Sequence, residues 1–207
     1  MYYIILLSTI VFSLISKKFS KMDKPLFILE IVLMTAVLCF RFGQGSDYFG
    51  YELNYNILAE GMSWRLIHGE IGYTFLSWMF ITLGANFKVF ILVISAIMMI
   101  NTYRGIIKLS EFKMLSLVLL YSTYYLTFYS SAIREGLILS VVIGWLLPLY
   151  LDEKYNEFFI VTIISATIHS SCIIMLFLVL FKRTSFIQNR YTAMFISFLG
   201  GLGVAAV

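Results

Sequence analysis

The sequence predicts an all-α fold, a polytopic transmembrane bundle of about eight apolar segments. Of the 207 residues, 61% are hydrophobic and only 13% are charged, whereas soluble domains contain about 45–50% apolar and about 25% charged residues. Several stretches of about 15 to 25 residues carry almost no ionised side chain, which the bilayer core favours. These observations exclude a soluble globular protein. No internal repeat or soluble domain is recognisable, so residues 1–207 form one transmembrane domain in this interpretation.

The charge balance and the cysteines exclude several classes of function. The net charge of +4 is small and scattered along the chain, which argues against nucleic acid as a partner. Cys39 and Cys172 both lie inside hydrophobic runs, where cysteine behaves as a small apolar residue. The sequence therefore predicts neither a metal site nor a cofactor.

The first predicted helix covers residues 2–15 and is followed at once by four lysines. These are Lys17, Lys18, Lys21 and Lys24. A signal peptide carries its charge before the apolar stretch and a cleavage site after it. The reversed order favours an uncleaved helix with its N-terminus outside. Pro25 opens the second helix, residues 26–40, because proline is tolerated in a first turn.

A polar stretch, residues 41–70, separates this hairpin from the rest and is expected to form an outer loop or helix. The third apolar segment, 71–83, contains 13 residues, or about 20 Å of helix against a hydrocarbon core of about 30 Å. This segment is therefore extended, tilted or re-entrant. The later segments are 87–103, 114–129, 133–151, 158–181 and an eighth that begins near Tyr191. Because the sequence stops inside the eighth segment, the domain is expected to be incomplete at its C-terminus.

The distribution of basic residues does not decide the topology. If every segment crosses, nine basic residues lie inside and six outside, and a re-entrant third segment changes the split to eight and seven. Both are weak signals by the positive-inside rule. Only the re-entrant arrangement places Arg134 on the same face as Asp47 and Glu70.

The first polar motif begins at Arg41 and ends with Asp47. Two glycines between them allow a turn that would bring the cation and the carboxylate to one site. An aromatic stripe at helical spacing follows, formed by Tyr48, Tyr51, Glu52 and Tyr55. The alternative for the tyrosines is a lipid headgroup belt. Carboxylates near membrane depth need a functional reason.

The second and third motifs lie at the beginning of segment 133–151 and inside segment 158–181. Arg134 and Glu135 open the former, and a planar guanidinium suits phosphate because it makes two parallel hydrogen bonds. The alternative is a loop cation that pairs with Glu135 or a lipid phosphate. His169 is expected in the middle of a membrane helix, where it must face the protein interior or a wet cavity. A neutral buried histidine bonded to a carbonyl or a serine is the alternative.

These motifs together resemble the EpsG family of exopolysaccharide polymerases, which are similar in role to Wzy-type O-antigen polymerases. The resemblance rests on five motifs in order: Arg41-Phe-Gly-Gln-Gly-Ser-Asp-Tyr48, Glu70-x-Gly-Tyr73, Leu83-Gly-x-Asn-Phe87, Ile133-Arg-Glu-Gly136 and Thr167-Ile-His-Ser170. Glu135 stands where glutamine is expected. The chain is little over half the usual family length.

The resemblance implies a bacterial cytoplasmic-membrane enzyme that transfers an oligosaccharide from undecaprenyl pyrophosphate to a growing polysaccharide. Its partners would be this lipid-linked oligosaccharide, the polysaccharide, membrane lipids and other membrane proteins of polysaccharide synthesis. Arg134 and Arg41 would neutralise the leaving pyrophosphate. The base would be Asp47, Glu70 or His169. Tyr48, Tyr51 and Glu135 would contact substrate, because tyrosines can stack on sugar faces.

Such a transferase needs its base and its cationic clamp on one face, so Asp47, Glu70 and Arg134 are expected to open to the outside. Two alternatives come from other classes of protein. A transporter or flippase of lipid-linked sugars would use the same charges along a path, although its usual duplicated half is not recognisable. A catalytically inactive truncated scaffold would fit the short length.

Overall fold

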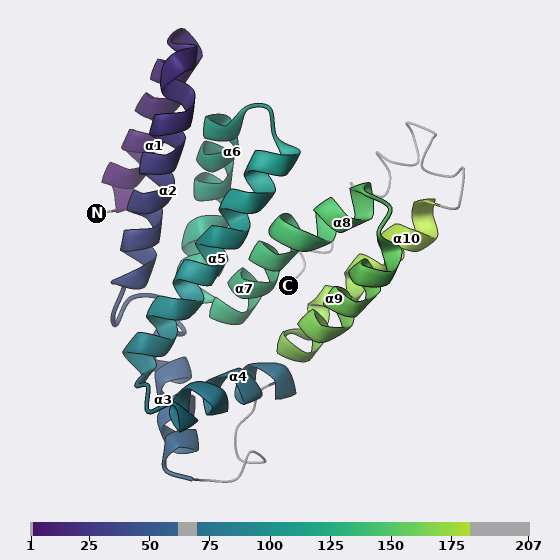
Figure 1. The fold of residues 1–207 in the computed structure, drawn as a ribbon. Helices are drawn as coiled ribbons and strands as arrows, with labels where there is room; N and C mark the ends of the chain where they lie inside the picture. Colours follow the sequence, from purple (N-terminus) through teal and green to yellow (C-terminus); the bar gives the residue numbers. More distant parts are fainter. Residues whose placement is uncertain (1, 62–69, 183–207) are drawn as a thin grey trace.

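The structure is a computed structural model that describes residues 2–61 and 70–182, and these ranges contain helices and no strand (Figure 1). The first hairpin pairs α1 (Tyr2–Lys18) with α2 (Asp23–Cys39) through a short turn, η1 (Ser20–Met22). Lys17 and Lys18 close α1, and Asp23 opens α2. Each charge has the sign that the helix dipole favours at that terminus. The first two predicted helices are therefore confirmed.

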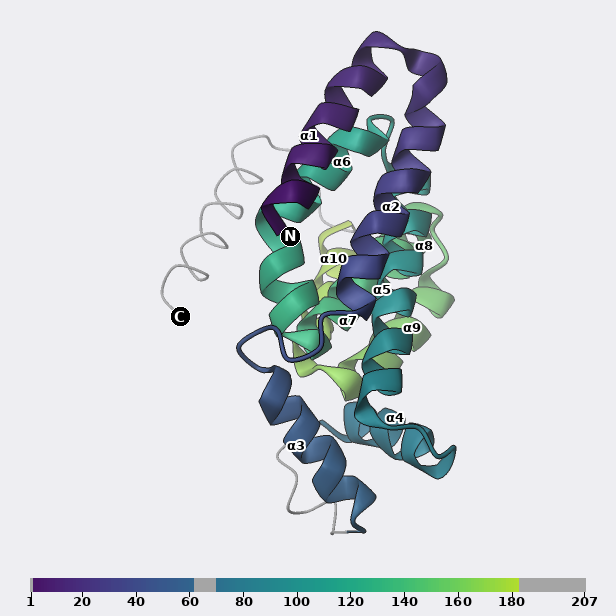
Figure 2. The ribbon, with the colours of Figure 1, turned by 90° about the vertical axis from the view of Figure 1, so that its left-hand side faces the viewer.

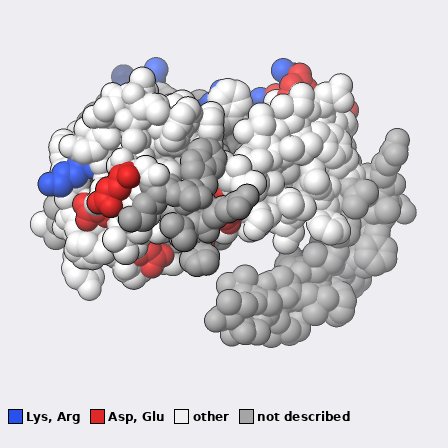
Figure 3. Space-filling view, turned by 90° about the horizontal axis from the view of Figure 1, so that it is seen from below, with Lys and Arg blue, Asp and Glu red and all other residues white. Residues whose placement is uncertain are grey.

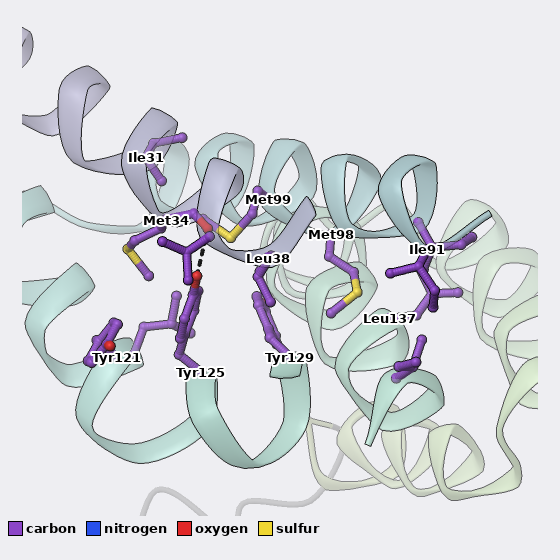
Figure 4. Packing of buried hydrophobic residues seen from close by; sticks show 14 of the residues in the cluster. Ile31, Met34, Leu38, Ile91, Met98, Met99, Tyr121, Tyr125, Tyr129 and Leu137 are labelled. Atoms are coloured by element: carbon purple, nitrogen blue, oxygen red, sulfur yellow. Dashed lines mark hydrogen bonds between the residues drawn. The ribbon is translucent and has the colours of Figure 1, made fainter. Parts of the chain in front are cut away.

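The central helix is α5 (Phe87–Leu109), against which α2 and the later helices pack. It begins at Asn86, whose side-chain oxygen accepts a hydrogen bond of 3.0 Å from the Val89 N–H, as expected of an N-cap. Met98 and Phe90 are completely buried on its inner face. Figure 4 shows Met98 and Met99 directed into the cluster that α2 and the following helices share.

After α5 the chain continues through α6 (Lys113–Leu120) and a π-helical segment, η3 (Tyr121–Ser131). Tyr125 from η3 is fully buried and donates a hydrogen bond of 2.6 Å to the Met34 carbonyl of α2 (Figure 4). The next helix is continuous over α7 (Ile133–Val141), η4 (Val142–Leu146) and α8 (Leu147–Leu151). The hydrogen bond to Met34 holds η3, the segment that leads into α7, against α2.

Two short helices, α3 (Tyr48–Ala59) and α4 (Ile71–Thr82), lie at one end of the bundle. They lie beyond the last residues of α2 and the first residues of α5. Figures 1 and 2 agree that α4 runs across this end of the bundle. The third apolar segment therefore does not lie alongside the other helices, and the chain enters and leaves it at one end of the bundle. We call this end the α4 end. The opposite end carries the α1–α2 turn and the α5–α6 connection.

The seventh predicted segment, 158–181, is not one continuous span, and that prediction was wrong. Helix α9 (Tyr155–Ile168) ends before His169, a 3₁₀ segment η5 (Ser170–Met175) follows, and α10 (Leu176–Lys182) returns along the bundle. The Tyr150 hydroxyl, just before α9, donates a hydrogen bond of 3.1 Å to the Leu178 carbonyl of α10. The chain thus reverses at His169, which lies at the α4 end.

Within residues 2–61 and 70–182, two helices are long and apolar enough to cross a membrane, residues 87–109 and 133–151. The prediction of about eight crossing segments is not confirmed, because α4 is short and α9 is interrupted. The eighth predicted segment, from Tyr191, lies outside the described residues.

Candidate functional site

Five side chains from four segments meet at the α4 end, and we call them the Glu70 cluster. His169 Nδ1 lies 2.7 Å from Glu70 Oε1, and Arg134 donates a hydrogen bond from Nη1 to Glu70 Oε2. Arg134 Nε lies 3.4 Å from the Tyr51 hydroxyl. His169 Nε2 faces Glu135 Oε1 at 3.5 Å. The structure therefore brings together five of the residues that the sequence singled out separately.

The close contact between Gly72 and Thr167 brings Glu70 next to His169. Glu70 is the N-cap residue of α4 and has an extended backbone, with φ −66° and ψ 142°. A Cβ added at Gly72 would lie 2.3 Å from Thr167 Oγ1 and 2.8 Å from the Thr167 carbonyl oxygen. Only a residue without a side chain therefore allows the start of α4 to touch the end of α9.

His169 reaches the cluster because α9 stops at the preceding residue. Its backbone is extended, with φ −154° and ψ 119°, and directs the chain into the reversal. The expectation of a histidine inside a membrane helix is corrected, since His169 occupies a turn. An ionised carboxylate only accepts hydrogen bonds, so the contact with Glu70 places an imidazole proton on Nδ1, while Nε2 faces the second carboxylate, Glu135.

The electrostatics of the cluster keep Glu70 ionised. Burial alone raises the pKa of this carboxyl, but the hydrogen bond from His169 and the charge of Arg134 outweigh it, so the pKa lies below its ordinary value. The side chains of His169, Glu70 and Arg134 are 18%, 23% and 25% exposed. The cluster is thus partly dehydrated and still open to a ligand.

Glu135 has an unused hydrogen-bond acceptor close to the His169 imidazole. Its Oε2 atom is buried and has no partner among the described residues. The 3.5 Å between Glu135 Oε1 and His169 Nε2 exceeds the usual range of a good hydrogen bond. A hydroxyl of a bound ligand could donate a hydrogen bond to the free carboxylate oxygen.

Arg41 and Asp47 do not form the pair that the two glycines suggested, and this expectation is corrected. Arg41 is only 1% exposed and donates a hydrogen bond to the Tyr129 carbonyl. Asp47 is exposed and accepts a hydrogen bond of 2.8 Å from the Ser46 hydroxyl. The turn follows a different path because Gly45, at φ +102°, packs directly on the Ser130 carbonyl.

Within the described residues, the side chains of Asp47 and Tyr48 form no hydrogen bond or ion pair with the side chains of the Glu70 cluster, although the Tyr51 backbone N–H donates a hydrogen bond of 3.0 Å to the Asp47 carbonyl. Tyr48 is 2% exposed and packs edge to face on Phe87, with ring centroids 5.3 Å apart. The loop that precedes α3 is nevertheless tied to the beginning of α7, because the Ser46 N–H donates a hydrogen bond of 3.3 Å to Ser131 Oγ. Asp47 therefore remains a predicted site residue that lies near the cluster in the fold.

Sequence reasoning missed the roles of Gly72 and Tyr73. Tyr73 is 8% exposed, and its hydroxyl has no partner among the described residues. Both positions belong to the motif that begins at Glu70, which was the available signal. Within residues 2–61 and 70–182, no group of three His, Cys, Asp or Glu residues is arranged to hold a metal ion.

Comparisons with known proteins agree with the motifs in the cluster. Residues 24–207 match the family model described as EpsG family. No curated protein and no solved structure matches the chain. The match extends over most of the sequence and includes every residue of the Glu70 cluster. The chain therefore belongs to the EpsG family, and is a membrane protein of exopolysaccharide biosynthesis.

Proposed function

We propose that the protein is a polysaccharide polymerase that joins oligosaccharide repeat units carried on undecaprenyl pyrophosphate. The observation that carries this proposal is the contact of one carboxylate, Glu70, with both His169 and Arg134. Glycosyl transfer from a lipid pyrophosphate needs a base for the acceptor hydroxyl and a cation for the leaving group. The Glu70 cluster supplies both groups in one partly dehydrated place.

His169 is the base in this proposal. Its Nε2 lone pair takes the proton of an acceptor sugar hydroxyl while that oxygen forms the new bond to the anomeric carbon of the donor. Glu70 holds the imidazole by its Nδ1 proton and stabilises the imidazolium that results. The same division of roles is found wherever a carboxylate orients a catalytic histidine. Glu135 accepts a hydrogen bond from the acceptor sugar beside Nε2.

Arg134 meets the charge that develops on the leaving group. The bond between the anomeric carbon and the pyrophosphate oxygen breaks as the new glycosidic bond forms, and its electron pair leaves with the lipid pyrophosphate. Donors already oriented toward such charge give much of the rate of many enzymes. The Glu70 carboxylate and the Tyr51 hydroxyl hold the guanidinium in place before substrate arrives.

The Glu70 cluster faces the outside of the cell in this proposal, in a chain that crosses the membrane several times. Helices α1 and α2 have 17 residues each, or about 25 Å at 1.5 Å per residue. The described basic residues near the opposite end are Lys17, Lys18, Lys21, Lys24, Arg104, Lys108, Lys113 and Lys154.

At the α4 end the described basic residues are Arg41, Lys88 and Arg134. Figure 3 views this end, where acidic side chains interrupt a largely uncharged surface. The positive-inside rule then places the α4 end outside. Among the described residues the basic side chains thus gather at the end opposite α4, which supports the outer location proposed for the Glu70 cluster.

The test is reconstitution of the purified full chain in vesicles with a synthetic polyprenyl-pyrophosphate-linked repeat unit. Products that contain two or more repeats, formed with release of polyprenyl pyrophosphate, support the polymerase. Movement of the lipid between leaflets without new glycosidic bonds would replace it with a flippase. If neither new glycosidic bonds nor movement of the lipid is observed, the protein is an inactive scaffold.

A further inference from the structure

Tyr2, at the beginning of α1, joins parts of the chain that lie far apart in the sequence. Its hydroxyl donates a hydrogen bond of 2.6 Å to Gln44 Oε1, in the loop 41–47 between α2 and α3, which we call the Gln44 loop. The same hydroxyl lies 3.5 Å from Ser130 Oγ, too far for a strong hydrogen bond. The Tyr2 carbonyl accepts a hydrogen bond of 2.6 Å from the Tyr121 hydroxyl, at the start of η3. Tyr2 therefore ties the Gln44 loop to η3.

The Gln44 loop also packs directly on the junction between η3 and α7 (Figure 2). Gly45 lies so close to this junction that an added Cβ would be 2.6 Å from the Ser130 carbonyl oxygen. The next residue, Ser46, donates a backbone hydrogen bond of 3.3 Å to Ser131 Oγ. The loop is thus held from two sides, by Tyr2 and by the end of η3.

Both segments that Tyr2 joins lead to Arg134. The Gln44 loop continues into α3, which carries Tyr51. The Tyr51 hydroxyl lies 3.4 Å from Arg134 Nε, and the guanidinium carbon lies 5.7 Å from the centre of the Tyr51 ring. The end of η3 continues into α7, in which Arg134 is the second residue. The orientation of the guanidinium therefore depends on how α3 and α7 lie relative to each other.

The Gln44 loop depends on such contacts because its backbone has little conformational preference of its own. It contains Gly43 at φ +71° and Gly45 at φ +102°, and glycine adopts positive φ about as readily as negative φ. The hydrogen bond between Tyr2 and Gln44 is exposed, so water competes with it and its net contribution to global stability is small. Loss of this bond should loosen the loop locally and leave the bundle folded.

We propose that Tyr2 is a positioning residue of the polymerase site, because it holds the Gln44 loop against η3 and thereby orients Arg134 for the leaving pyrophosphate. The inference rests on the proposed function, in which Arg134 meets the charge of the leaving group. Among the described residues, Tyr2 forms no hydrogen bond with a side chain of the Glu70 cluster. It acts through the loop, α3 and Tyr51 rather than on the substrate.

The first part of the experiment measures backbone hydrogen exchange of residues 42–47 in the purified full chain. Tyr2→Phe removes the hydroxyl and keeps the carbonyl that Tyr121 binds. Exchange should become about two- to tenfold faster, the scale of one net hydrogen bond. Gln44→Leu breaks the same bond from the other side and should act alike. Tyr3→Phe is the matched control, because Tyr3 is 88% exposed, and should exchange as wild type does.

The second part measures the rate at which a two-repeat product forms. Tyr2→Phe should lower kcat by about tenfold, because a small misplacement far from the chemistry can cost up to about 100-fold. KM should hardly change, since Arg134 acts on charge that develops in the transition state. In an Arg134→Lys background, Tyr2→Phe should have little further effect if it acts through Arg134. A purely structural role would instead reduce the rate equally in both backgrounds.

Three results would overturn the proposal. These are wild-type exchange in Tyr2→Phe, wild-type kcat in Tyr2→Phe, and equal losses with Arg134 and with Lys at position 134. Failure of the proposed function is distinguishable from these results, because hydrogen exchange requires no glycosyl transfer. Faster exchange in Tyr2→Phe, with no polymer formed even by wild type, would keep the loop contact and reject the polymerase. Polymer formation that is indifferent to Tyr2→Phe would do the reverse.

Discussion

The imidazole of His169 and the carboxylate of Glu70 lie 2.7 Å apart, although 99 positions separate them in the sequence. The contact exists because α9 ends at Ile168 and because Gly72 lets the start of α4 touch Thr167. It places an imidazole proton on Nδ1 and directs Nε2 toward Glu135, and in the proposed reaction Nε2 acts as the base. Several predictions about the reaction depend on this one contact.

Arg134→Lys should reduce polymer formation strongly without loss of protein from the membrane. Arg134 uses two different nitrogens for Glu70 and Tyr51, and a lysine ammonium cannot reproduce this planar arrangement. Loss of one oriented contact to a developing charge reduces rates roughly 100- to 1,000-fold. The rate is measured on protein of normal membrane abundance. A rate within about threefold of wild type would return Arg134 to the role of a loop or lipid-binding cation.

Gly72→Ala should separate α4 from α9 and reduce both stability and polymer formation. The added Cβ would meet Thr167 Oγ1 at 2.3 Å, and overpacking of this kind costs about 1–3 kcal/mol. Gly50→Ala in α3 is the matched control, because a Cβ there meets nothing within 4 Å. Melting temperature and polymer yield are compared for the two variants. Identical behaviour of Gly72→Ala and Gly50→Ala would show that the close approach does not hold the site together.

The pH dependence of stability should reveal the ionised state of Glu70. Its pKa in the folded protein lies below the ordinary value of 4.5, so its contribution is complete above that value and is lost as the pH falls through the lower folded pKa. The difference in melting temperature between wild type and Glu70→Gln should therefore not decrease from pH 7 to about pH 5.

Glu60→Gln is the control for this titration, because Glu60 is exposed at the end of α3. The difference in melting temperature between wild type and Glu60→Gln should stay small from pH 7 to about pH 5. A wild-type advantage over Glu70→Gln that already disappears between pH 7 and 6 would contradict the ionised pair.

Cysteines placed at Ser46 and at Ser131 should react with the same membrane-impermeant reagent from outside. The two residues are joined by the hydrogen bond from the Ser46 N–H, and Ser46 is exposed. A cysteine at Ser20, in the turn between α1 and α2, should react only after permeabilisation. Cys39 and Cys172 are replaced first. Reaction of Ser131→Cys from the inside alone would reject the shared outer face.

The extent to which the sequence predicted the site follows from what determines each feature. The helices at 2–15, 26–40 and 87–103 follow from local hydrophobicity, and the structure contains them. The interruption at His169 could not be predicted in this way, because residues 155–182 contain neither glycine nor proline. Its cause is tertiary, since His169 pairs with a residue of α4.

The sequence identified each residue of the Glu70 cluster separately, but it did not predict that these residues lie together. Glu70 and Arg134 are 64 positions apart, and no local pattern connects them. The turn at Gly43 and Gly45 was expected to pair Arg41 with Asp47. Packing of Gly45 on Ser130 set its direction instead, which buries Arg41 and leaves Asp47 exposed.

The most direct test of the account is a double-mutant cycle between Glu70 and His169, read as the rate at which purified protein forms a two-repeat product. If Glu70 acts through His169, His169→Gln should reduce the rate at least about 100-fold, the lower end of the range for general-base catalysis. Glu70→Gln should reduce it nearly as much, and the double variant should be no slower than His169→Gln. Losses that multiply in the double variant would contradict this account, as would a rate that stays at the wild-type value in all three variants.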